Sequence, residues 1–593
     1  MSKIENDFYI LENDVLTIKP GHKVIRKELF DETIRETTKK IIIPEDVIEL
    51  GDGVFSYFKA LKSVTVPESV TRIPRDAFVD CSSLTDIILP KNLKHIGDSA
   101  FYGCKKITHI ALHEGLKTIE SRAFMCCKNL KEIILPNSVD VLGKSVFELC
   151  DNLEKAKISK SICELPARFF HSCENLHSVE LPEKLTSIGD NCFVGCKTLK
   201  SITFPDALNI IGSHAFFYSG LAEIVIPGSV KCVSDSAFES SKNLTNVKLL
   251  DGVEHIGCNA FAYCSSLSNI ELPNTLIGIS RGAFDGNNIT NMVIPDSVEK
   301  LGEYAFYNCK SLSEITIGSN LKKVERDCFS ACISLKNINI TNVPDWCKID
   351  FDNSRANPLR YAKYLCLNNK PIIDLIIPEG VTKIGSHCFE NCKSLKSISI
   401  PSTMTEIKGF AFSYLNTDTV YINDLSNWCN IKFNNDDSSP LGFAKNVYID
   451  GKEIENLIIP ENVTKISPYA FSFYGLITSL TIPGNVKEIS SWAFQNCDNL
   501  KTVNIKSGVT KIGEGAFLGC HRLSKVFLPE SIEYMHKTCF DSNAHVSVKR
   551  SVIFKCRDSK CIKEWAKIND VNISVSKIDN FIESISDDNC HRR

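Results

Sequence analysis

The chain has 593 residues, of which 68 are lysine or arginine, 71 are aspartate or glutamate, and 43% are hydrophobic. This balance of charge, with no long run of either sign, argues against nucleic acid or an anionic membrane as the partner. A chain of this length would ordinarily fold into roughly three or four globular domains.

Residues 1–40 come first and do not follow the pattern that fills most of the chain. Short apolar runs at 8–10 and 15–18, separated by Asn13-Asp14, predict a β-hairpin. We expect this segment to cap the apolar end of the array that follows. It has no apolar core of a secretory signal, and no stretch approaches the roughly 18 apolar residues of a membrane span. The localisation is therefore unknown, although these features alone would be typical of a cytoplasmic protein.

A pattern of 23 residues then repeats along the chain, starting at residue 41. A fixed period of this size predicts a stacked repeat solenoid, and it lies in the range of roughly 20 to 29 residues known for leucine-rich repeats. Since a solenoid adds core one coil at a time, the length requires no separate globular domains. Nineteen copies can be anchored on Phe55, Phe78, Phe101, Phe124, Phe147, Phe170, Phe193, Phe216, Phe238, Phe261, Phe284, Phe306, Phe329, Phe389, Phe412, Phe471, Phe494, Phe517 and Phe540.

One copy shows how a coil is expected to form. From Leu130 to Leu135, fixed apolar positions alternate with variable ones, which predicts a strand with one buried face. Pro136 ends the strand because proline has no N–H for a continuing ladder. Gly143 marks a bend, and a short helical turn is expected to carry Phe147 inward. Stacked coils would align their strands in a parallel β-sheet over one continuous core.

Many of the 26 cysteines occupy one slot of the repeat, three residues after the anchoring phenylalanine. Elsewhere the slot holds Ser219, Ser241 or Asn287, which indicates a small buried side chain, sometimes one that donates a hydrogen bond. This pattern favours structural thiols over a disulfide framework, and with them a reducing compartment. The slot cysteines are Cys81, Cys104, Cys127, Cys150, Cys173, Cys196, Cys264, Cys309, Cys332, Cys392, Cys497 and Cys520.

The variable strand positions are predicted to project from the exposed face of the sheet, because side chains alternate along a strand. Their mixed chemistry, more apolar toward the amino-terminal end, is suited to binding another macromolecule. The same pattern also fits a surface that is only solvated. The candidate binding residues are Ile88, His109, Glu132, Ile134, Lys157, Glu180, Thr203, Lys248, Glu271 and Thr316.

Two inserted modules, residues 342–377 and 424–459, interrupt the array and match each other at an offset of 82 residues. Trp346 corresponds to Trp428, and each is followed by a cysteine. Hairpin turns are expected at Asn368-Asn369 and Asp450-Gly451. The tryptophans are candidate binding residues, although a small accessory core is the interpretation that we favour. The array is thereby divided into residues 41–341, 378–423 and 460–545.

Residues 546–593 are expected to form a carboxy-terminal cap with a polar tail. The pattern predicts a strand at 552–554, a helix at 559–568 and a closing strand at 571–575. Trp565 would lie on the apolar side of that helix.

Motifs that carry catalysis are absent from the sequence. It has no His-Glu-x-x-His, no Gly-x-x-x-x-Gly-Lys-Ser/Thr and no Gly-x-Ser-x-Gly. Cys556 and Cys561 are near neighbours and His591 follows Cys590, but neither arrangement has a second ligand pair at zinc-site spacing. The sequence therefore predicts a protein that is not an enzyme, with no metal and no cofactor.

The repeated pattern, Ile-x-Ile-Pro-x-x-Val-x-x-Ile-Gly-x-x-Ala-Phe-x-x-Cys-x-x-Leu, resembles the BspA-like (Treponema pallidum type) leucine-rich repeat family. A clean copy runs from Ile294 to Leu312, and the resemblance covers roughly residues 41–545. The inserted Trp-Cys modules also look like segments common in that family. The resemblance implies a leucine-rich-repeat solenoid with no catalytic residues. It also implies display at the surface of bacteria or parasitic protists, as a surface antigen with a role in adhesion.

The function predicted from these observations is non-enzymatic binding of a macromolecule, by protein–protein interaction or adhesion. The resemblance suggests an extracellular-matrix or cell-surface protein as the partner, with no nucleic acid and no membrane span. An intracellular structural scaffold without a role in host adhesion is the alternative that the sequence leaves open. The identity of the ligand and the oligomeric state cannot be predicted.

Overall fold

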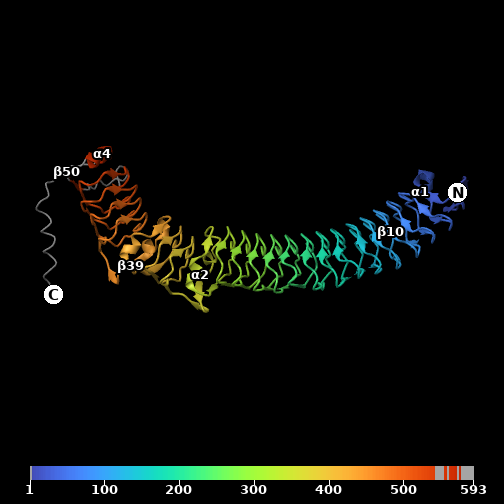
Figure 1. Cartoon of the computed structure of the whole chain (residues 1–593), viewed down its shortest axis with the longest axis horizontal. Helices are drawn as coiled ribbons and strands as arrows, with labels where there is room; N and C mark the ends of the chain where they lie inside the picture. The colour runs from blue at the N-terminus through green and yellow to red at the C-terminus, as the bar shows by residue number, and fades with distance from the viewer. Residues whose placement is uncertain (1–2, 541–552, 557–559, 570–572, 576–593) are drawn as a thin grey trace. The chain divides into compact units, whose positions relative to one another are not determined.

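The computed structural model describes residues 3–540, 553–556, 560–569 and 573–575, which form two compact units. The first unit is Met1–Gly318 with Cys328–Ser334, and the second is Ser319–Asp327 with the residues from Leu335 onward. Each unit is a stack of coils (Figure 1). Most coils contribute one strand to a wide parallel ladder and a two-residue strand to a narrow one. The predicted repeat solenoid with a parallel sheet is confirmed.

In the first unit the wide ladder begins with a hairpin and continues as parallel strands. Its strands are β1 (Ile4–Glu5), β2 (Tyr9–Glu12), β3 (Val15–Ile18), β5 (Lys40–Ile42), β7 (Ser63–Thr65), β9 (Asp86–Ile88), β12 (Glu132–Ile134), β14 (Lys155–Lys157), β16 (Ser178–Glu180), β19 (Glu223–Ile226), β21 (Asn246–Leu249), β23 (Asn269–Glu271), β25 (Asn291–Val293) and β27 (Glu314–Ile317). Antiparallel pairing of β2 with β3 places Tyr9 opposite Ile18 and Glu12 opposite Val15. The predicted hairpin is therefore confirmed.

The narrow ladder of the first unit is also parallel. It consists of β4 (Val24–Ile25), β6 (Glu49–Leu50), β8 (Arg72–Ile73), β10 (His95–Ile96), β11 (Thr118–Ile119), β13 (Val141–Leu142), β15 (Glu164–Leu165), β17 (Ser187–Ile188), β18 (Ile210–Ile211), β20 (Cys232–Val233), β22 (His255–Ile256), β24 (Gly278–Ile279) and β26 (Lys300–Leu301). In these short strands the second residue is generally the buried one, as Ile96 and Ile119 illustrate. Their pairing keeps identical positions of neighbouring coils side by side.

The second unit repeats this arrangement around the two inserts. Its wide ladder has β29 (Asn337–Ile340), β31 (Tyr364–Leu367), β32 (Lys370–Pro371), β33 (Asp374–Ile376), β35 (Ser397–Ile400), β37 (Thr417–Ile422), β39 (Ala444–Ile449), β40 (Lys452–Glu453), β41 (Asn456–Ile458), β43 (Ser479–Ile482), β45 (Thr502–Ile505), β47 (Lys525–Leu528), β49 (Ile553–Cys556) and β50 (Ile573–Val575). Its narrow strands are β28 (Lys323–Val324), β30 (Asp350–Phe351), β34 (Lys383–Ile384), β36 (Glu406–Ile407), β38 (Lys432–Phe433), β42 (Lys465–Ile466), β44 (Glu488–Ile489), β46 (Lys511–Ile512) and β48 (Tyr534–Met535).

The anchoring phenylalanines form the centre of the core in each unit. They are almost fully buried, and neighbouring rings stack, with Phe78 and Phe101 5.3 Å apart at an interplanar angle of 4°. Phe216 and Phe238 stack at the same distance. Because each ring covers the next, a coil buries its apolar surface only against its neighbours, as expected for a solenoid.

The segment around each anchoring phenylalanine is a run of turns, so the prediction of a helical turn is wrong. In the coil of Phe147, Ser145 and Leu149 have φ angles of 58° and 60°, and these two positions are left-handed in most other coils. Left-handed residues stop a right-handed helix. The backbone N–H groups donate to the following coil instead, from Phe147 to the Phe169 carbonyl at 3.0 Å and from Leu149 to the His171 carbonyl at 2.8 Å.

The cysteine slot supplies hydrogen bonds between coils. Sγ of Cys104 lies 3.1 Å from the carbonyl oxygen of Phe78 in the preceding coil, and Nδ2 of Asn287 donates to the Phe261 carbonyl at 3.1 Å. Burial raises the pKa of the Cys264 thiol to about 12, which keeps the thiol protonated and able to donate. The described cysteines are free thiols. The slot thus gives the buried carbonyl of Phe78, which already accepts from the N–H of Cys81 at 3.2 Å, a second donor from the next coil.

The amino-terminal cap contains a helix that the sequence analysis did not predict. Helix α1 (Glu32–Thr37) is capped by Asp31, whose side chain accepts from the N–H of Ile34 at 3.0 Å. The segment buries Phe30 beside Phe55, with ring centroids 5.8 Å apart. The column of phenylalanine rings therefore begins inside the cap.

The carboxy-terminal cap has the predicted helix, α4 (Lys560–Ile568). Trp565 is 4% exposed and packs edge-on against Phe540, with centroids 5.7 Å apart. Its indole N–H donates to the carbonyl of His536 at 3.1 Å, so Trp565 covers the last coil as predicted. The side chain of Cys556, the pair Cys590-His591 and the tail after 575 lie outside the described residues.

Each insert adds a coil with its own helix and hairpin. Helix α2 (Val343–Cys347) precedes β30 and β31, and helix α3 (Leu425–Trp428) precedes β38 and β39. Strands β31 and β39 continue the wide ladder in parallel, and β32 and β40 return antiparallel to them. Asn368 and Asn369 have φ of 52° and 60°, and Asp450 and Gly451 have φ of 49° and 75°. The predicted hairpin turns are confirmed.

Candidate binding face

The residue two positions before the proline of a coil projects outward from the wide ladder. In β9 this residue is Ile88, which is 61% exposed, and in β12 it is Ile134, which is 55% exposed next to the buried Ile133. Thr316, in β27, is only partly exposed. The expected alternation of buried and exposed strand positions is confirmed, and the outward column defines the candidate binding face.

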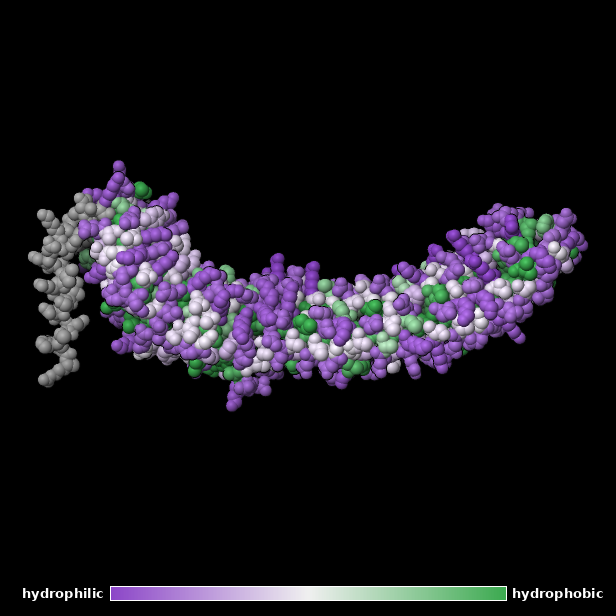
Figure 2. All heavy atoms as spheres, in the orientation of Figure 1, coloured by the Kyte–Doolittle hydropathy of each residue, from purple (hydrophilic) through white to green (hydrophobic). Residues whose placement is uncertain are grey.

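Four charged candidate residues pair with each other across neighbouring strands. Nζ of Lys157 lies 2.8 Å from a carboxylate oxygen of Glu180, and Nζ of Lys248 lies 3.1 Å from one of Glu271. Pairs this exposed contribute little to stability. Each pair cancels charge on the face. Glu132, in β12 next to β14, is also exposed. Figure 2 shows hydrophobic residues in small groups among hydrophilic ones on the visible face.

His109 and Thr203 are exposed, but they lie in coils that form no strand of the wide ladder. The wide ladder of the first unit is therefore interrupted between β9 and β12 and between β16 and β19. A further interruption separates β23 from β25. The exposed face is a series of short sheets rather than the single aligned sheet that the repeat predicted.

A shortened coil accompanies the interruption after Thr203. The step from Phe216 to Phe238 is 22 residues, because one residue is missing between the slot residue Ser219 and Leu221. Gly220 passes so close to the preceding coil that an added Cβ would lie 2.0 Å from the carbonyl oxygen of Lys197. A coil between β23 and β25 is shortened in the same way. The interruption at His109 falls between coils of full length, and nothing in the sequence marks it.

The interruption next to β16 opens a hollow of about 530 Å³ on the face. It is lined by Ser178 and Glu180 from β16 and by Ser201 and Thr203 from the following coil. Among the residues that the structure describes, no backbone hydrogen bond joins residues 200–204 to β16. The structure thus brings two candidate residues, Glu180 and Thr203, into the lining of one hollow.

Further outward residues in the second unit were missed by the sequence analysis. Ile376 and Ile458 are 68% and 65% exposed, and the rings of Tyr421 and Tyr448 stack with centroids 5.4 Å apart. The signal was present in the sequence, because Ile376 and Ile458 also stand two positions before a proline. The sequence analysis did not include them because the inserts break the regular 23-residue spacing of the coils.

The tryptophans of the inserts face the core. Trp346 is 2% exposed and Trp428 is 1% exposed. Their indole N–H groups donate to the carbonyls of Cys388 at 3.1 Å and Ala470 at 2.8 Å, each 42 residues further along the chain. This placement matches an accessory core, so any ligand contact by the inserts must come from other side chains.

Within the described ranges, no helix combines the length and apolarity needed to cross a membrane. The same part of the chain holds no group of three or more histidine, cysteine, aspartate or glutamate side chains placed to hold a metal ion.

Comparison with known proteins identifies the repeat. The family model described as a BspA type leucine-rich repeat region matches residues 23–154, 117–245, 231–356, 360–439 and 442–581. No curated protein matches the chain. The family match therefore covers most of the sequence and reaches into both inserts.

Solved structures of several bacterial repeat proteins are similar to this chain. A leucine-rich repeat protein from Bacteroides ovatus ATCC 8483 is 20% identical, covers 94% of this chain and 98% of its own, and has a TM-score of 0.38. A leucine rich cell surface protein from Faecalibacterium prausnitzii A2-165 is 24% identical, covers 60% and 98%, and has a TM-score of 0.35. The T. pallidum leucine-rich repeat protein is 27% identical, covers 33% and 91%, and has a TM-score of 0.28.

Proposed function

Because the chain belongs to the BspA-type leucine-rich repeat family, we propose that it is a non-enzymatic binding protein whose outward strand face contacts a protein partner. The observation that carries this proposal is the row of exposed apolar residues along the face. Ile88, Ile134, Val225 and Val293 are 61%, 55%, 51% and 63% exposed. Single exposed apolar residues are ordinary, but these recur at one position of the coil.

The chemistry of the face favours a protein surface over a charged polymer. The ion pairs Lys157–Glu180 and Lys248–Glu271 leave little net charge beside the apolar residues. Burying such side chains in a contact is favourable, at about 25 cal/mol per Å² of apolar surface. A rigid array also loses little conformational entropy on binding. We propose an extracellular-matrix or cell-surface protein as the partner, the kind first suggested by the repeat pattern.

The proposal can be tested with the full chain immobilised against a panel of purified extracellular-matrix proteins. A variant with Ile88→Lys, Ile134→Lys and Val293→Lys should bind its partner at least about tenfold more weakly, since buried apolar contacts dominate such interfaces. The matched control carries Ile210→Lys and Ile333→Lys, which are 53% and 67% exposed away from the outward column. Equal binding by wild type, face variant and control would show that the face is not the contact surface.

A further inference from the structure

A second hollow, of about 640 Å³, lies in the second unit between the two inserts. The first insert contributes Asp350 and Asp352, and the second contributes Asn434 and Asn435. Two regular coils between them, and Lys323 from the coil before the first insert, supply the remaining walls. The lining residues are Lys323, Asp350, Phe351, Asp352, Ser386, His387, Lys408, Gly409, Phe410, Asn434 and Asn435.

An exposed aromatic ring forms one wall of this hollow. Phe410 is 43% exposed, and His387 stacks on it with ring centroids 5.0 Å apart and an interplanar angle of 15°. Nδ1 of His387 lies 2.6 Å from a carboxylate oxygen of Glu390, which is 4% exposed. One face of the Phe410 ring is thus supported from within the protein, and the exposed part remains available to a ligand.

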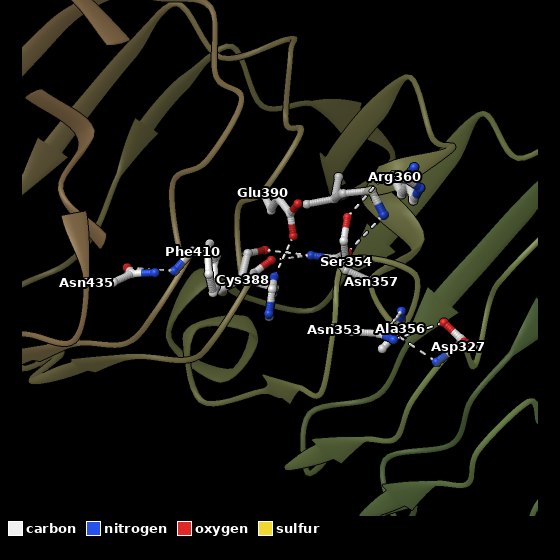
Figure 3. A network of polar contacts seen from close by, with 12 residues as sticks. Asp327, Asn353, Ser354, Ala356, Asn357, Arg360, Cys388, Glu390, Phe410 and Asn435 are labelled. Carbon is white, nitrogen blue, oxygen red and sulfur yellow. Dashed lines mark hydrogen bonds and ion pairs between the residues drawn. The ribbon is translucent and has the colours of Figure 1, made fainter. Parts of the chain in front are cut away.

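Each insert makes a hydrogen bond to the backbone of one of these two aromatic residues. Nδ2 of Asn357, in the first insert, donates to the carbonyl of His387 at 2.6 Å. Oδ1 of Asn435, in the second insert, accepts from the N–H of Phe410 at 3.1 Å, and Figure 3 shows this contact beside the Phe410 ring. Because the backbone of both residues is held in this way and the His387 ring is hydrogen-bonded to Glu390, the aromatic wall needs little ordering when a ligand binds.

The contact made by Asn435 repeats one made 82 residues earlier in the chain. There, Oδ1 of Asn353 accepts from the N–H of Asp327 at 3.3 Å (Figure 3). The coil position that holds Asp327 beside the first insert therefore holds Phe410 beside the second. Both inserts therefore make the same asparagine contact with a neighbouring coil. Only the contact beside the second insert places an exposed aromatic ring at that position.

The charged residues of the hollow neutralise each other. Nζ of Lys408 lies 2.5 Å from Oδ2 of Asp350, and Lys323 forms an ion pair with Asp352. Oδ1 of Asp350 also accepts from the N–H of Ser386 at 3.1 Å. The lining therefore has no excess charge to attract an ion, yet it offers both donors and acceptors around its rim.

These features together select one class of ligand. A charged ligand would have to break an ion pair already formed, and an apolar one would strip water from polar groups without replacing their hydrogen bonds. A neutral sugar ring avoids both costs. Its adjacent hydroxyl groups both donate and accept, so they match carboxylate and amide side chains, while its C–H face can pack on the ring of Phe410. We propose that this hollow binds a neutral pyranose unit of a glycan.

The test uses the full chain and small neutral sugars as probes. Methyl glucoside, methyl galactoside and methyl mannoside are titrated and followed by saturation-transfer NMR, with glucuronate and glucosamine as charged comparators. At least one neutral glycoside should bind saturably, with a dissociation constant on the order of millimolar for so small a ligand. Binding should also slow hydrogen exchange of the amides at residues 408–410.

Phe410→Ala should weaken this binding at least about tenfold, since it removes the aromatic wall. Phe473→Ala is the matched control, because Phe473 is 41% exposed in the same unit but does not line the hollow. Asp352→Asn should also weaken binding. Because this change keeps the shape of the side chain, it tests the hollow even if Phe410→Ala disturbs folding. Three results would each overturn the proposal. They are no saturable binding of any neutral glycoside up to roughly 50 mM, preference for a charged comparator, and unchanged binding by both Phe410→Ala and Asp352→Asn.

Discussion

The regular coils and the two insert coils use different side chains to donate hydrogen bonds to buried backbone carbonyls beside the phenylalanine column. In a regular coil, a small slot residue such as Cys104 bonds to the phenylalanine carbonyl of the preceding coil. In the insert coils, the donor is the indole N–H of Trp346 or Trp428, which reaches a carbonyl of a later coil. The slot holds cysteine, serine or asparagine in most coils and Phe58, Leu415 or Tyr474 in three others, whereas both inserts use tryptophan. The slot of a regular coil thus tolerates different side chains. The tryptophan of an insert coil both donates a hydrogen bond and fills a large volume in the core.

The difference also determines what each region can present to a ligand. A regular coil exposes one or two strand residues on a sheet, and neighbouring charges such as Lys157 and Glu180 pair with one another. The insert coils place polar side chains around the regular coils between them, and this produces a hollow with an aromatic wall. An extended surface and a hollow therefore arise from one repeat, the hollow forming where insert side chains such as Asp352 and Asn435 lie beside Phe410 of a regular coil.

The largest expected effect concerns the indoles. Trp346→Ala and Trp428→Ala should each lower the free energy of unfolding of the second unit by about 3–5 kcal/mol, since each removes a large buried ring and its hydrogen bond to a backbone carbonyl. Chemical denaturation followed by circular dichroism measures the change. The Trp→Phe variants should lose less, because they keep most of the volume. A loss below about 0.5 kcal/mol for the alanine variants would show that the indoles are not part of the core.

The next effect tests a regular coil that buries a charge. The Glu148 carboxylate is 5% exposed and accepts from Nε of Arg168 at 3.0 Å. Burial alone would raise its pKa, but the hydrogen bonds from Arg168 and Ser145 and the charges of Arg168 and His171 lower the pKa below 4.5. Arg168→Met leaves this carboxylate with only Ser145 and His171 as polar neighbours, so we expect a loss of about 1–2 kcal/mol. The loss is smaller than for a fully buried ion pair because the Arg168 side chain is half exposed.

The pH dependence of this effect has a definite sign. Since the folded pKa of Glu148 is lowered, its contribution is fully present above the unfolded pKa and is lost as the pH falls through the folded pKa. Arg168→Met should therefore destabilise most at neutral pH and progressively less toward acid. Arg122→Met is the control, because Arg122 occupies the same coil position and pairs with the more exposed Asp98 at 3.0 Å. A pH-independent loss in Arg168→Met would contradict this account.

The sequence predicted the features that depend on periodicity. The stacked phenylalanines, the cysteine slot and the strand alternation around Ile133 follow from residue spacing, and the hairpin turn at Asn368-Asn369 follows from turn chemistry. The left-handed turns were not predicted, because residues such as Arg122 and Leu149 carry no signal for that conformation. Propensity is a weak guide where hydrogen bonds between coils determine the backbone.

The hollow between the inserts could not be predicted from spacing either. Its walls combine Asp350 with Phe410 and Asn435, which are 60 and 85 residues away along the chain. Only the stacking of the coils brings them together. Comparison of the two inserts indicated Trp346 and Trp428 as candidates, because these tryptophans are shared by both inserts. The ligand-facing positions are instead those where the two inserts differ, such as Asp352 and Asn434.

A smaller effect is expected for the slot of the regular coils. Sγ of Cys150 lies 3.2 Å from the carbonyl oxygen of Phe124. Cys150→Ala should cost about 1 kcal/mol, because the buried carbonyl keeps its bond from the Cys127 N–H at 3.2 Å but loses the bond from the thiol. Cys150→Ser should be close to neutral, since Ser241 already bonds to the Phe216 carbonyl at 2.9 Å from the same slot. Cys163→Ala, at an exposed cysteine, is the control. Equal losses for the alanine and serine variants would indicate that volume rather than the hydrogen bond matters in the slot.

The smallest expected change in stability concerns exposed apolar residues, which we expect to contribute to binding but not to folding. Ile88→Lys and Ile376→Lys, in a regular coil and in the coil after an insert, should each change the free energy of unfolding by less than about 0.5 kcal/mol. The reason is that these side chains are 61% and 68% exposed, so little of their surface is buried on folding. Thermal melting of the full chain measures the change. A loss above about 1 kcal/mol would mean that these side chains pack within the chain itself. The row of exposed apolar residues would then no longer support a partner, whereas the hollow beside Phe410 would be unaffected.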